Sequence, residues 1–211
     1  MEDRRGRDGT SFATTAVTWS KVGGRGRVPS MGVRRILTYP EASLKDVAED
    51  VSNINGDTIQ TIEDMARTMY AAPGIGLAAP QIGVAERMIV LDIGQDDAGG
   101  EHKPNLIELI NPEIREHGDD LITYEEGCLS VIDYRAEVTR PEQILVVGWT
   151  RDQKEIQIEA DGLLSVCLQH EIDHLDGTLF LDRLSRLKRN MYAKRVKKAL
   201  REGRPISRGE D

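Results

Sequence analysis

The chain has 211 residues, of which 39% are apolar, 30% charged and 4% aromatic, and its net charge is −8. This length and composition predict one folded domain with an aliphatic core and exclude a wholly disordered chain. No run approaches the roughly 18 apolar residues that a membrane span requires. The scarcity of aromatic residues argues against a base-stacking nucleic-acid surface, while the net charge still permits a local basic patch.

Residues 1–30 differ from the rest of the chain in charge. They carry +3, whereas residues 31–211 carry −11. They contain no apolar stretch typical of a secretory signal, and three acids among the first eight residues argue against an organellar transit peptide. We therefore expect a disordered extension over residues 1–30, a folded part that begins at Met31, and a cytoplasmic protein whose two cysteines form no disulfide framework.

Hydrophobic periodicity predicts three helices. The first covers Thr58–Ala71 and ends at Pro73-Gly74. Asp161 is placed to cap the second, over Leu163–Leu175, which ends at Gly177. The third covers about Arg183–Arg201.

Six β-rich runs lie between the first and second helices. They are Met88–Asp92, Leu106–Ile110, Leu121–Glu125, Ala136–Thr139, Ile144–Trp149 and Glu155–Ala160. A helix followed by several strands and then helices predicts an α+β fold with mostly antiparallel sheets. Asp92–Pro104 is polar and rich in glycine, and is expected to form an exposed loop.

The most specific local pattern is H-E-x-x-H at residues 170–174. On a helix, His170 and His174 lie one turn apart on the same face, so both imidazoles can bind one metal ion. Glu171 lies beside that face, where a general base for a water molecule is expected. The same spacing also occurs by chance on solvated helices, so the pattern alone leaves that alternative open.

An open catalytic metal site requires a third protein ligand. Only acids follow His174 as further ligands, and none is well placed. Cys128 lies just after a predicted strand and beside Gly127, which allows close approach of another backbone. A single cysteine is also often a small buried hydrophobe. Cys167 is a competing thiol one turn before His170, but a ligand there would crowd the metal site.

The central helix also predicts an apolar wall, because Leu163, Val166 and Cys167 share the face that carries both histidines. The segment Gly74–Gly83 lacks the lysine of a phosphate-binding loop. In it, Gln81 follows a run of small residues and offers a neutral amide donor suited to an oxyanion.

Three segments, GIGLAAPQ, EGCLS and QHEIDHLDG, occur in the order typical of peptide deformylases. The chain resembles this family from Met31 to about Leu187, which implies a catalytic domain over residues 31–187. The resemblance implies a metal-dependent hydrolase that removes the formyl group from the N-terminal formyl-methionine of new proteins and releases formate. It also implies a fold with the H-E-x-x-H helix at its centre and a C-terminal helix.

The resemblance implies a role for each matching residue. Cys128, His170 and His174 bind the metal, usually Fe2+, for which Zn2+, Ni2+ or Co2+ can substitute. Glu171 is the general acid and base, while Gln81 and the Leu129 backbone N–H hold the oxyanion. Positions that pair with the substrate backbone as an added strand are matched by Ile75, Gly76 and Gly127. Bacterial members commonly have proline where this chain has Ile132, so the site's rim is expected to be looser.

Two other functions remain open on the sequence. A zincin-like endopeptidase would act on internal peptide bonds, but the chain lacks its downstream ligand. A non-catalytic protein with a structural Cys/His metal site would need a closed set of four ligands, with Cys167 as the fourth.

Residues 188–211 are expected to form a basic C-terminal helix and tail. Between Arg183 and Arg204 there are ten Lys or Arg residues and one acid, Glu202. Such runs are usually solvated faces. The excess of positive charge, together with the docking that the resemblance to bacterial deformylases implies for this helix, predicts binding to the ribosome near the exit tunnel. We expect no membrane partner and no DNA partner. A thin apolar stripe is expected to dock the helix, formed by Leu184, Leu187, Met191 and Val196.

Overall fold

The computed structural model describes residues 32–96 and 102–206. The extension expected over residues 1–30 and the centre of the loop expected at Asp92–Pro104 lie outside the described residues. The helices are α1 (Gly56–Ala71), α2 (Gly162–Leu175) and α3 (Arg186–Glu202), and the 3₁₀ turns are η1 (Ala42–Lys45), η2 (Ala79–Ile82) and η3 (Phe180–Arg183). None of the helices in the described part is long and apolar enough to cross a membrane.

The strands form one large sheet and two hairpins. They are β1 (Gly76–Ala78), β2 (Met88–Leu91), β3 (Gln95–Asp96), β4 (His102–Lys103), β5 (Ile107–His117), β6 (Leu121–Cys128), β7 (Val131–Pro141), β8 (Gln143–Trp149) and β9 (Glu155–Asp161). The large sheet has the order β1-β2-β5-β8-β9 with antiparallel neighbours, while β3 pairs with β4 and β6 with β7. The α+β fold with mostly antiparallel sheets is therefore confirmed.

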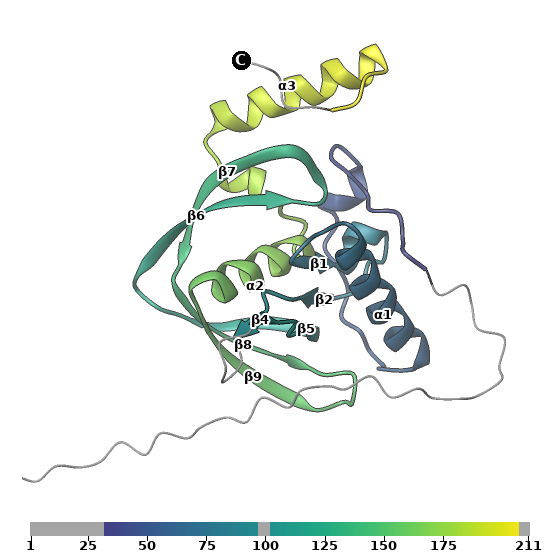
Figure 1. The fold of residues 1–211 in the computed structure, drawn as a ribbon, viewed down its shortest axis with the longest axis vertical. Coiled ribbons are helices and arrows are strands. Elements are labelled where there is room, and N and C mark those ends of the chain that lie inside the picture. Colours follow the sequence, from purple (N-terminus) through teal and green to yellow (C-terminus); the bar gives the residue numbers. More distant parts are fainter. Residues whose placement is uncertain (1–31, 97–101, 207–211) are drawn as a thin grey trace, which may run out of the picture.

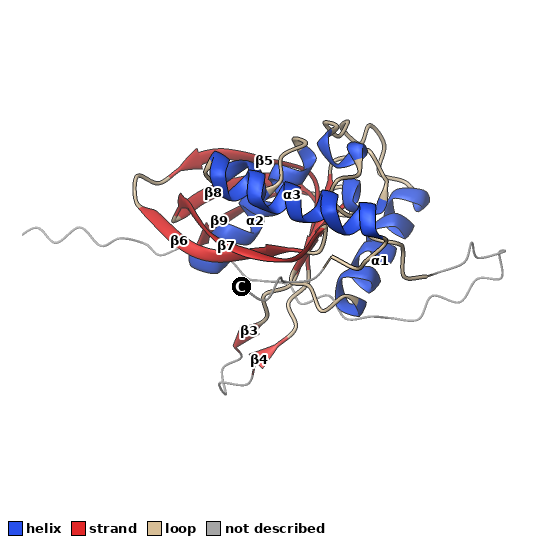
Figure 2. Ribbon diagram, turned by 90° about the horizontal axis from the view of Figure 1, so that it is seen from above, coloured by secondary structure: helices blue, strands red, loops and turns tan. Residues whose placement is uncertain are grey.

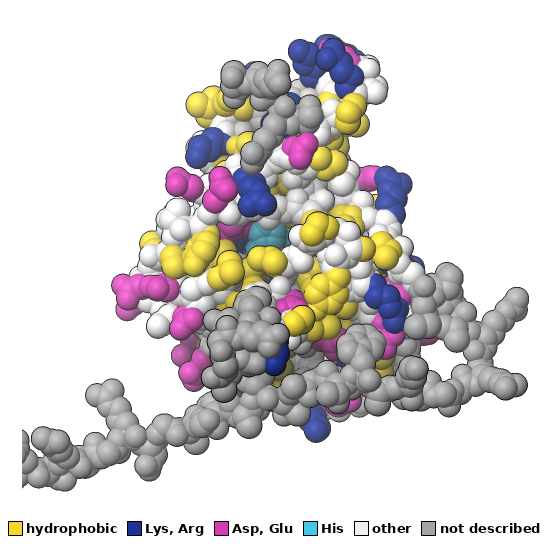
Figure 3. Space-filling view, in the orientation of Figure 1, with side chains coloured by type: hydrophobic (Ala, Val, Ile, Leu, Met, Phe, Trp, Pro, Cys, Tyr) yellow, Lys and Arg dark blue, Asp and Glu magenta, His cyan; other side chains and the backbone are white. Residues whose placement is uncertain are grey.

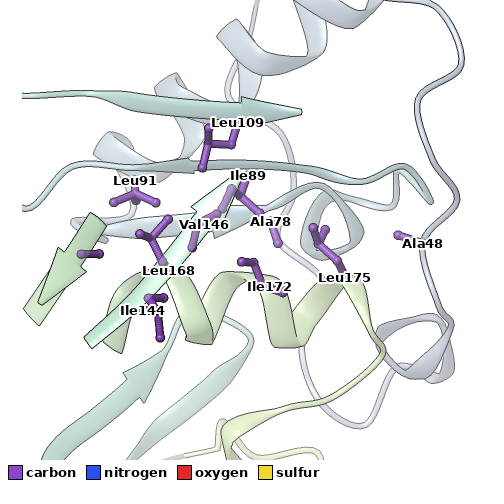
Figure 4. Packing of buried hydrophobic residues seen from close by; sticks show 11 residues of the cluster. Ala48, Ala78, Ile89, Leu91, Leu109, Ile144, Val146, Leu168, Ile172 and Leu175 are labelled. Carbon is purple, nitrogen blue, oxygen red and sulfur yellow. The ribbon is translucent and has the colours of Figure 1, made fainter. Parts of the chain in front are cut away.

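Helix α2 lies at the centre of the molecule, between the large sheet and the β6–β7 hairpin (Figure 1). Every residue from Ser165 to Leu175 is buried. Leu168, Ile172 and Leu175 pack against the sheet, where they meet Ile89 and Val146 and others of one apolar cluster (Figure 4). A helix buried on all sides is held in one orientation, so its opposite face can place polar side chains accurately.

Helix α1 begins with a side-chain cap. The Asn55 side chain accepts hydrogen bonds from the N–H groups of Asp57 and Thr58, at 2.8 and 3.1 Å, which satisfies two of the unpaired donors at a helix start. Its apolar stripe, with Ile62 and Met69 fully buried, packs against β1 and β2. This packing fixes the segment between α1 and η2 that forms one wall of the site.

The C-terminal helix lies across the outside of β7, as the view from above shows (Figure 2). The expected start at Arg183 is wrong, because Phe180–Arg183 forms the separate turn η3 and the Ser185 hydroxyl caps α3 by accepting from the Lys188 N–H at 3.3 Å. The expected docking stripe is also partly wrong.

The docking face of α3 consists of Tyr192 and Val196, which are buried, whereas Leu187 and Met191 are 70% and 62% exposed. Leu184 is buried as expected, but it precedes the helix. Its position therefore does not fix which face of α3 turns inward.

Candidate active site

Three side chains expected to bind a metal come together at the centre of the fold. Cys128 stands at the end of β6, and His170 and His174 lie one turn apart on α2. One ligand atom from each of the three lies within 4.8 Å of the others, and Cys128 Sγ is 3.2 Å from His174 Nε2. Within residues 32–96 and 102–206 this is the one such group, and it does not include Cys167. The described residues therefore bring together three candidate ligand atoms, not four.

Buried groups around the ligands orient them. The carboxylate of Glu126 is 2.8 Å from Nδ1 of His170, so this ring keeps Nε2 for another partner. Although burial raises the pKa of Glu126, its hydrogen bonds to Arg140 and His170 outweigh this and lower the pKa to about 2. Burial also holds the pKa of His174 well below its usual value, which keeps that imidazole neutral. For His170, burial lowers the pKa, but the contacts with Cys128 and Glu126 raise it overall.

Glu171 lies in the site beside the ligands. It is 5% exposed, and its Oε2 has no hydrogen-bond partner among the described residues. Burial raises the pKa of its carboxyl group to about 7, and the charge of His170 only partly opposes this. A carboxyl group whose pKa lies near neutrality can both accept and donate a proton.

The amide of Gln81 is held next to Cys128 by hydrogen bonds at both of its polar atoms. Its Oε1 accepts from the Ala78 N–H at 2.8 Å, and its Nε2 donates to Ser130 Oγ at 3.0 Å and lies 3.5 Å from Cys128 Sγ. Its amide nitrogen therefore donates to Ser130 and is directed toward Cys128, which places a neutral N–H donor next to the candidate metal ligands. Leu129, whose backbone N–H is the second expected donor, lines the same pocket.

A pocket of about 720 Å³ opens onto these residues. In the space-filling view, histidine is visible in a hollow bordered by apolar side chains (Figure 3). All residues expected to contact substrate line it, namely Ile75, Gly76, Gly127, Leu163, Val166 and Cys167. Burial raises the pKa of the Cys167 thiol to about 12, in the same direction as the nearby charge of Glu171.

The sequence reasoning missed a buried network of charges behind the ligands. Arg140 donates to Glu126 at 2.5 and 3.0 Å and to Asp173 at 2.9 Å, and Arg183 Nε donates to Asp173 at 2.6 Å. Both acids lie within sequence motifs, Glu126 in EGCLS and Asp173 in QHEIDHLDG, and this is the one sequence signal that could have indicated them. Arg140 lies in no motif, so only the folded structure reveals it.

The residues fit a single divalent transition-metal ion. A thiolate with two imidazoles is a donor set for such ions, and a carboxylate behind a histidine ligand is its usual support. The buried Glu171 oxygen without a partner could accept a proton from a water molecule bound to such an ion. Fold and site together define a metal-dependent hydrolase.

The chain belongs to the polypeptide deformylase family, whose model matches residues 33–190. Members of the family remove the formyl group from the N-terminal formyl-methionine of new proteins. The peptide deformylase of Agrobacterium fabrum is 48% identical over 171 residues, which cover 81% of this chain and 98% of that protein.

Solved structures of deformylases are also similar to this chain. The enzyme of Ehrlichia chaffeensis in complex with actinonin has a TM-score of 0.75 and 38% identity, over 81% of this chain and 99% of that one. The Met-Ala-Ser-bound class I type b enzyme of Acinetobacter baumannii has a TM-score of 0.67 and 32% identity, over 72% of this chain and 98% of that one. The comparisons do not favour the zincin-like endopeptidase or the non-catalytic protein.

Proposed function

We propose that this chain hydrolyses the formyl group of N-terminal formyl-methionine with the residues of the site described above. The observation that carries the proposal is the buried Glu171 carboxyl group, with one unpartnered oxygen, beside a Cys/His₂ ligand set. Cys128, His170 and His174 would hold the metal. When bound, the ion supplies Lewis-acid chemistry, which makes water more acidic and polarises a carbonyl.

Glu171 moves the proton. It takes a proton from a water molecule in the pocket, whose oxygen bonds to the formyl carbon. Gln81 and the Leu129 N–H donate to the oxygen on which negative charge develops. The C–N bond then breaks as Glu171 passes the proton to the amine nitrogen, which leaves formate and a free N-terminal methionine.

The pocket walls select the chain end. Ile75, Gly76 and Gly127 offer backbone groups at the margins of β1 and β6, where an extended peptide can add as a strand. The apolar wall holds a methionine side chain, and it consists of Leu163, Val166 and Cys167. The Met-Ala-Ser peptide bound to the Acinetobacter baumannii enzyme supports this class of substrate.

The activity is tested by formate release from formyl-Met-Ala-Ser, with acetyl-Met-Ala-Ser and an internal peptide as controls. We expect release from the formyl peptide alone. Cleavage of the internal peptide would instead indicate an endopeptidase, and the absence of any turnover by metal-loaded protein would indicate a structural metal site.

For the metal we propose Fe2+, with Zn2+, Ni2+ or Co2+ as substitutes. An open Cys/His₂ site exposes both Fe(II) and the Cys128 thiolate to oxygen. Protein purified without oxygen should contain one iron per chain and lose activity in air, whereas protein exchanged to Ni2+ or Co2+ should keep its activity. Full activity of iron-loaded protein after days in air would contradict this assignment.

We further propose that α3 binds ribosomal RNA near the exit tunnel, which would place the enzyme in the cytoplasm beside its nascent substrates. Eight of the 17 residues of α3 are Lys or Arg, and one is acidic. Four exposed lysines form what we call the lysine face of α3, namely Lys188, Lys194, Lys197 and Lys198. On this proposal residues 31–187 form the catalytic domain and residues 188–211 a basic docking segment beyond it.

A further inference from the structure

We propose that Tyr192 and Arg195 of α3 are positioning residues for substrate binding, which act through a segment at the rim of the pocket. This inference rests on the proposed function, because substrate is taken to bind in that pocket. Neither side chain lines the pocket itself. Their effect on substrate therefore has to pass through the residues that they hold.

The segment that they hold is a bulge in β7. Gly127 pairs with Arg135, but the next residue, Cys128, pairs with Val131, so Ile132, Asp133 and Tyr134 have no partner on β6. Asp133 has a positive φ of 49°, which is uncommon for a residue with a side chain. Backbone carbonyls in a bulge lose their ladder donors and need others. We call residues 132–134 the rim bulge.

Helix α3 supplies donors to the rim bulge. The Tyr192 hydroxyl donates to the Ile132 carbonyl at 3.3 Å, and Arg195 Nη2 donates to the Asp133 carbonyl at 3.0 Å. The Arg195 guanidinium also lies 5.5 Å from the centre of the Tyr134 ring and 5.0 Å from that of Tyr192. Ile132 has no ring to fix its φ, so these contacts restrain the backbone.

The rim bulge reaches both the pocket and the metal ligands. Asp133 and Tyr134 line the pocket, next to Arg135 and Val131. Tyr134 stacks on Phe180 with 6.2 Å between ring centres, and Phe180 stacks on His170 at 6.0 Å. Loosening the rim bulge should therefore weaken substrate binding first, while Cys128, Glu126 and the α2 backbone still hold the ligand set.

The test compares Arg195→Ala with Arg201→Ala, which removes the same side chain from an exposed position on the same helix. Loss of one charged hydrogen bond should raise KM for formyl-Met-Ala-Ser by about threefold to tenfold in Arg195→Ala, with kcat and metal content within about twofold of the parent. Arg195→Lys keeps the charge and one donor, and should recover most of this loss. The same KM in Arg195→Ala and Arg201→Ala, or a fall in kcat together with metal content, would overturn the proposal.

Hydrogen exchange provides a readout that does not depend on activity. The amides of residues 131–135 should exchange about threefold to tenfold faster in Arg195→Ala than in Arg201→Ala, while those of α2 stay unchanged. Tyr192→Phe keeps the ring and removes only the hydroxyl, so it replaces Arg195→Ala if that variant fails to fold. A parent chain that releases no formate would reject the proposed function, whereas unchanged exchange in the rim bulge would reject the positioning role.

Discussion

Gly76 lies directly against the carboxyl group of Glu171. A Cβ built on Gly76 would stand 2.8 Å from Glu171 Cδ and closer still to Oε1. Because such a contact is too short, any side chain at this position would push the Glu171 carboxyl group away from where it now lies. Glycine at this position thus lets β1, beside which the substrate strand is proposed to add, lie in direct contact with the proposed base.

Gly76→Ala should therefore move the Glu171 carboxyl group and lower kcat by at least about 10²-fold, the lower range for general acid–base catalysis. Metal content should not change, since neither residue is a ligand. Gly56→Ala is the matched control, because its Cβ would meet nothing within 4 Å. Steady-state formate release and metal analysis check both variants, and near-parental turnover of Gly76→Ala would contradict the assignment.

The Glu171→Gln variant should keep the metal and lose most of its deformylase activity. The amide has nearly the shape of the carboxyl group but cannot take a proton, so kcat should fall by about 10²–10⁴-fold. Glu159→Gln changes an exposed carboxyl group on β9 and should leave kcat as it is. If Glu171→Gln turns over at the rate of Glu159→Gln, another group is the base.

The two cysteines should differ in role, with Cys128 as a metal ligand and Cys167 as part of the pocket wall. Cys128→Ala should abolish metal binding, because Cys128 is one of the three proposed ligands. Cys167→Ala should keep the metal and raise KM by about tenfold, the effect of one small group missing from an apolar pocket. Metal analysis after dialysis tests this, and equal metal loss in the two variants would show that the thiols are assigned wrongly.

Arg140→Leu should destabilise the fold strongly. The Arg140 side chain is 1% exposed and pairs with Glu126 and Asp173, so its removal leaves the buried Glu126 without its guanidinium partner and Asp173 with Arg183 alone. Breaking a buried pair costs about 3–5 kcal/mol, whereas Arg115→Leu, at the exposed pair with Glu113, should cost about 0–1 kcal/mol. Urea unfolding of both variants, saturated with the same metal, gives the free energies. A similar cost for the two variants would show that the network is not stabilising.

The sequence predicted best what is local. The spacing of His170 and His174 on one helix turn determines their common face, and the motifs around Gln81 and Cys128 located the remaining groups. The partners of Arg140 lie 14 and 33 residues away, and no period or motif connects them. The prediction of the docking face of α3 was partly wrong for a related reason. The prediction placed Leu184, Leu187 and Met191 on one continuous helix from about Arg183, but α3 begins at Arg186 and Leu187 and Met191 are exposed.

The lysine face of α3 gives the last prediction. Removing residues 190–211 would also remove Tyr192 and Val196 from the core, so charge substitutions are the cleaner test. Changing the four lysines to glutamate should leave kcat and KM for formyl-Met-Ala-Ser within about twofold, because none of them lines the pocket and the hydrogen bonds from α3 to the rim bulge come from Tyr192 and Arg195.

Co-sedimentation with ribosomes at low salt should fall in that variant. The salt dependence of binding should also flatten, by about 0.7 to 0.9 in log–log slope for each phosphate that a lysine no longer neutralises. Changing the same four lysines to arginine keeps the charge and should preserve binding. Equal sedimentation of the glutamate and arginine variants would place the ribosome-binding surface elsewhere on the chain.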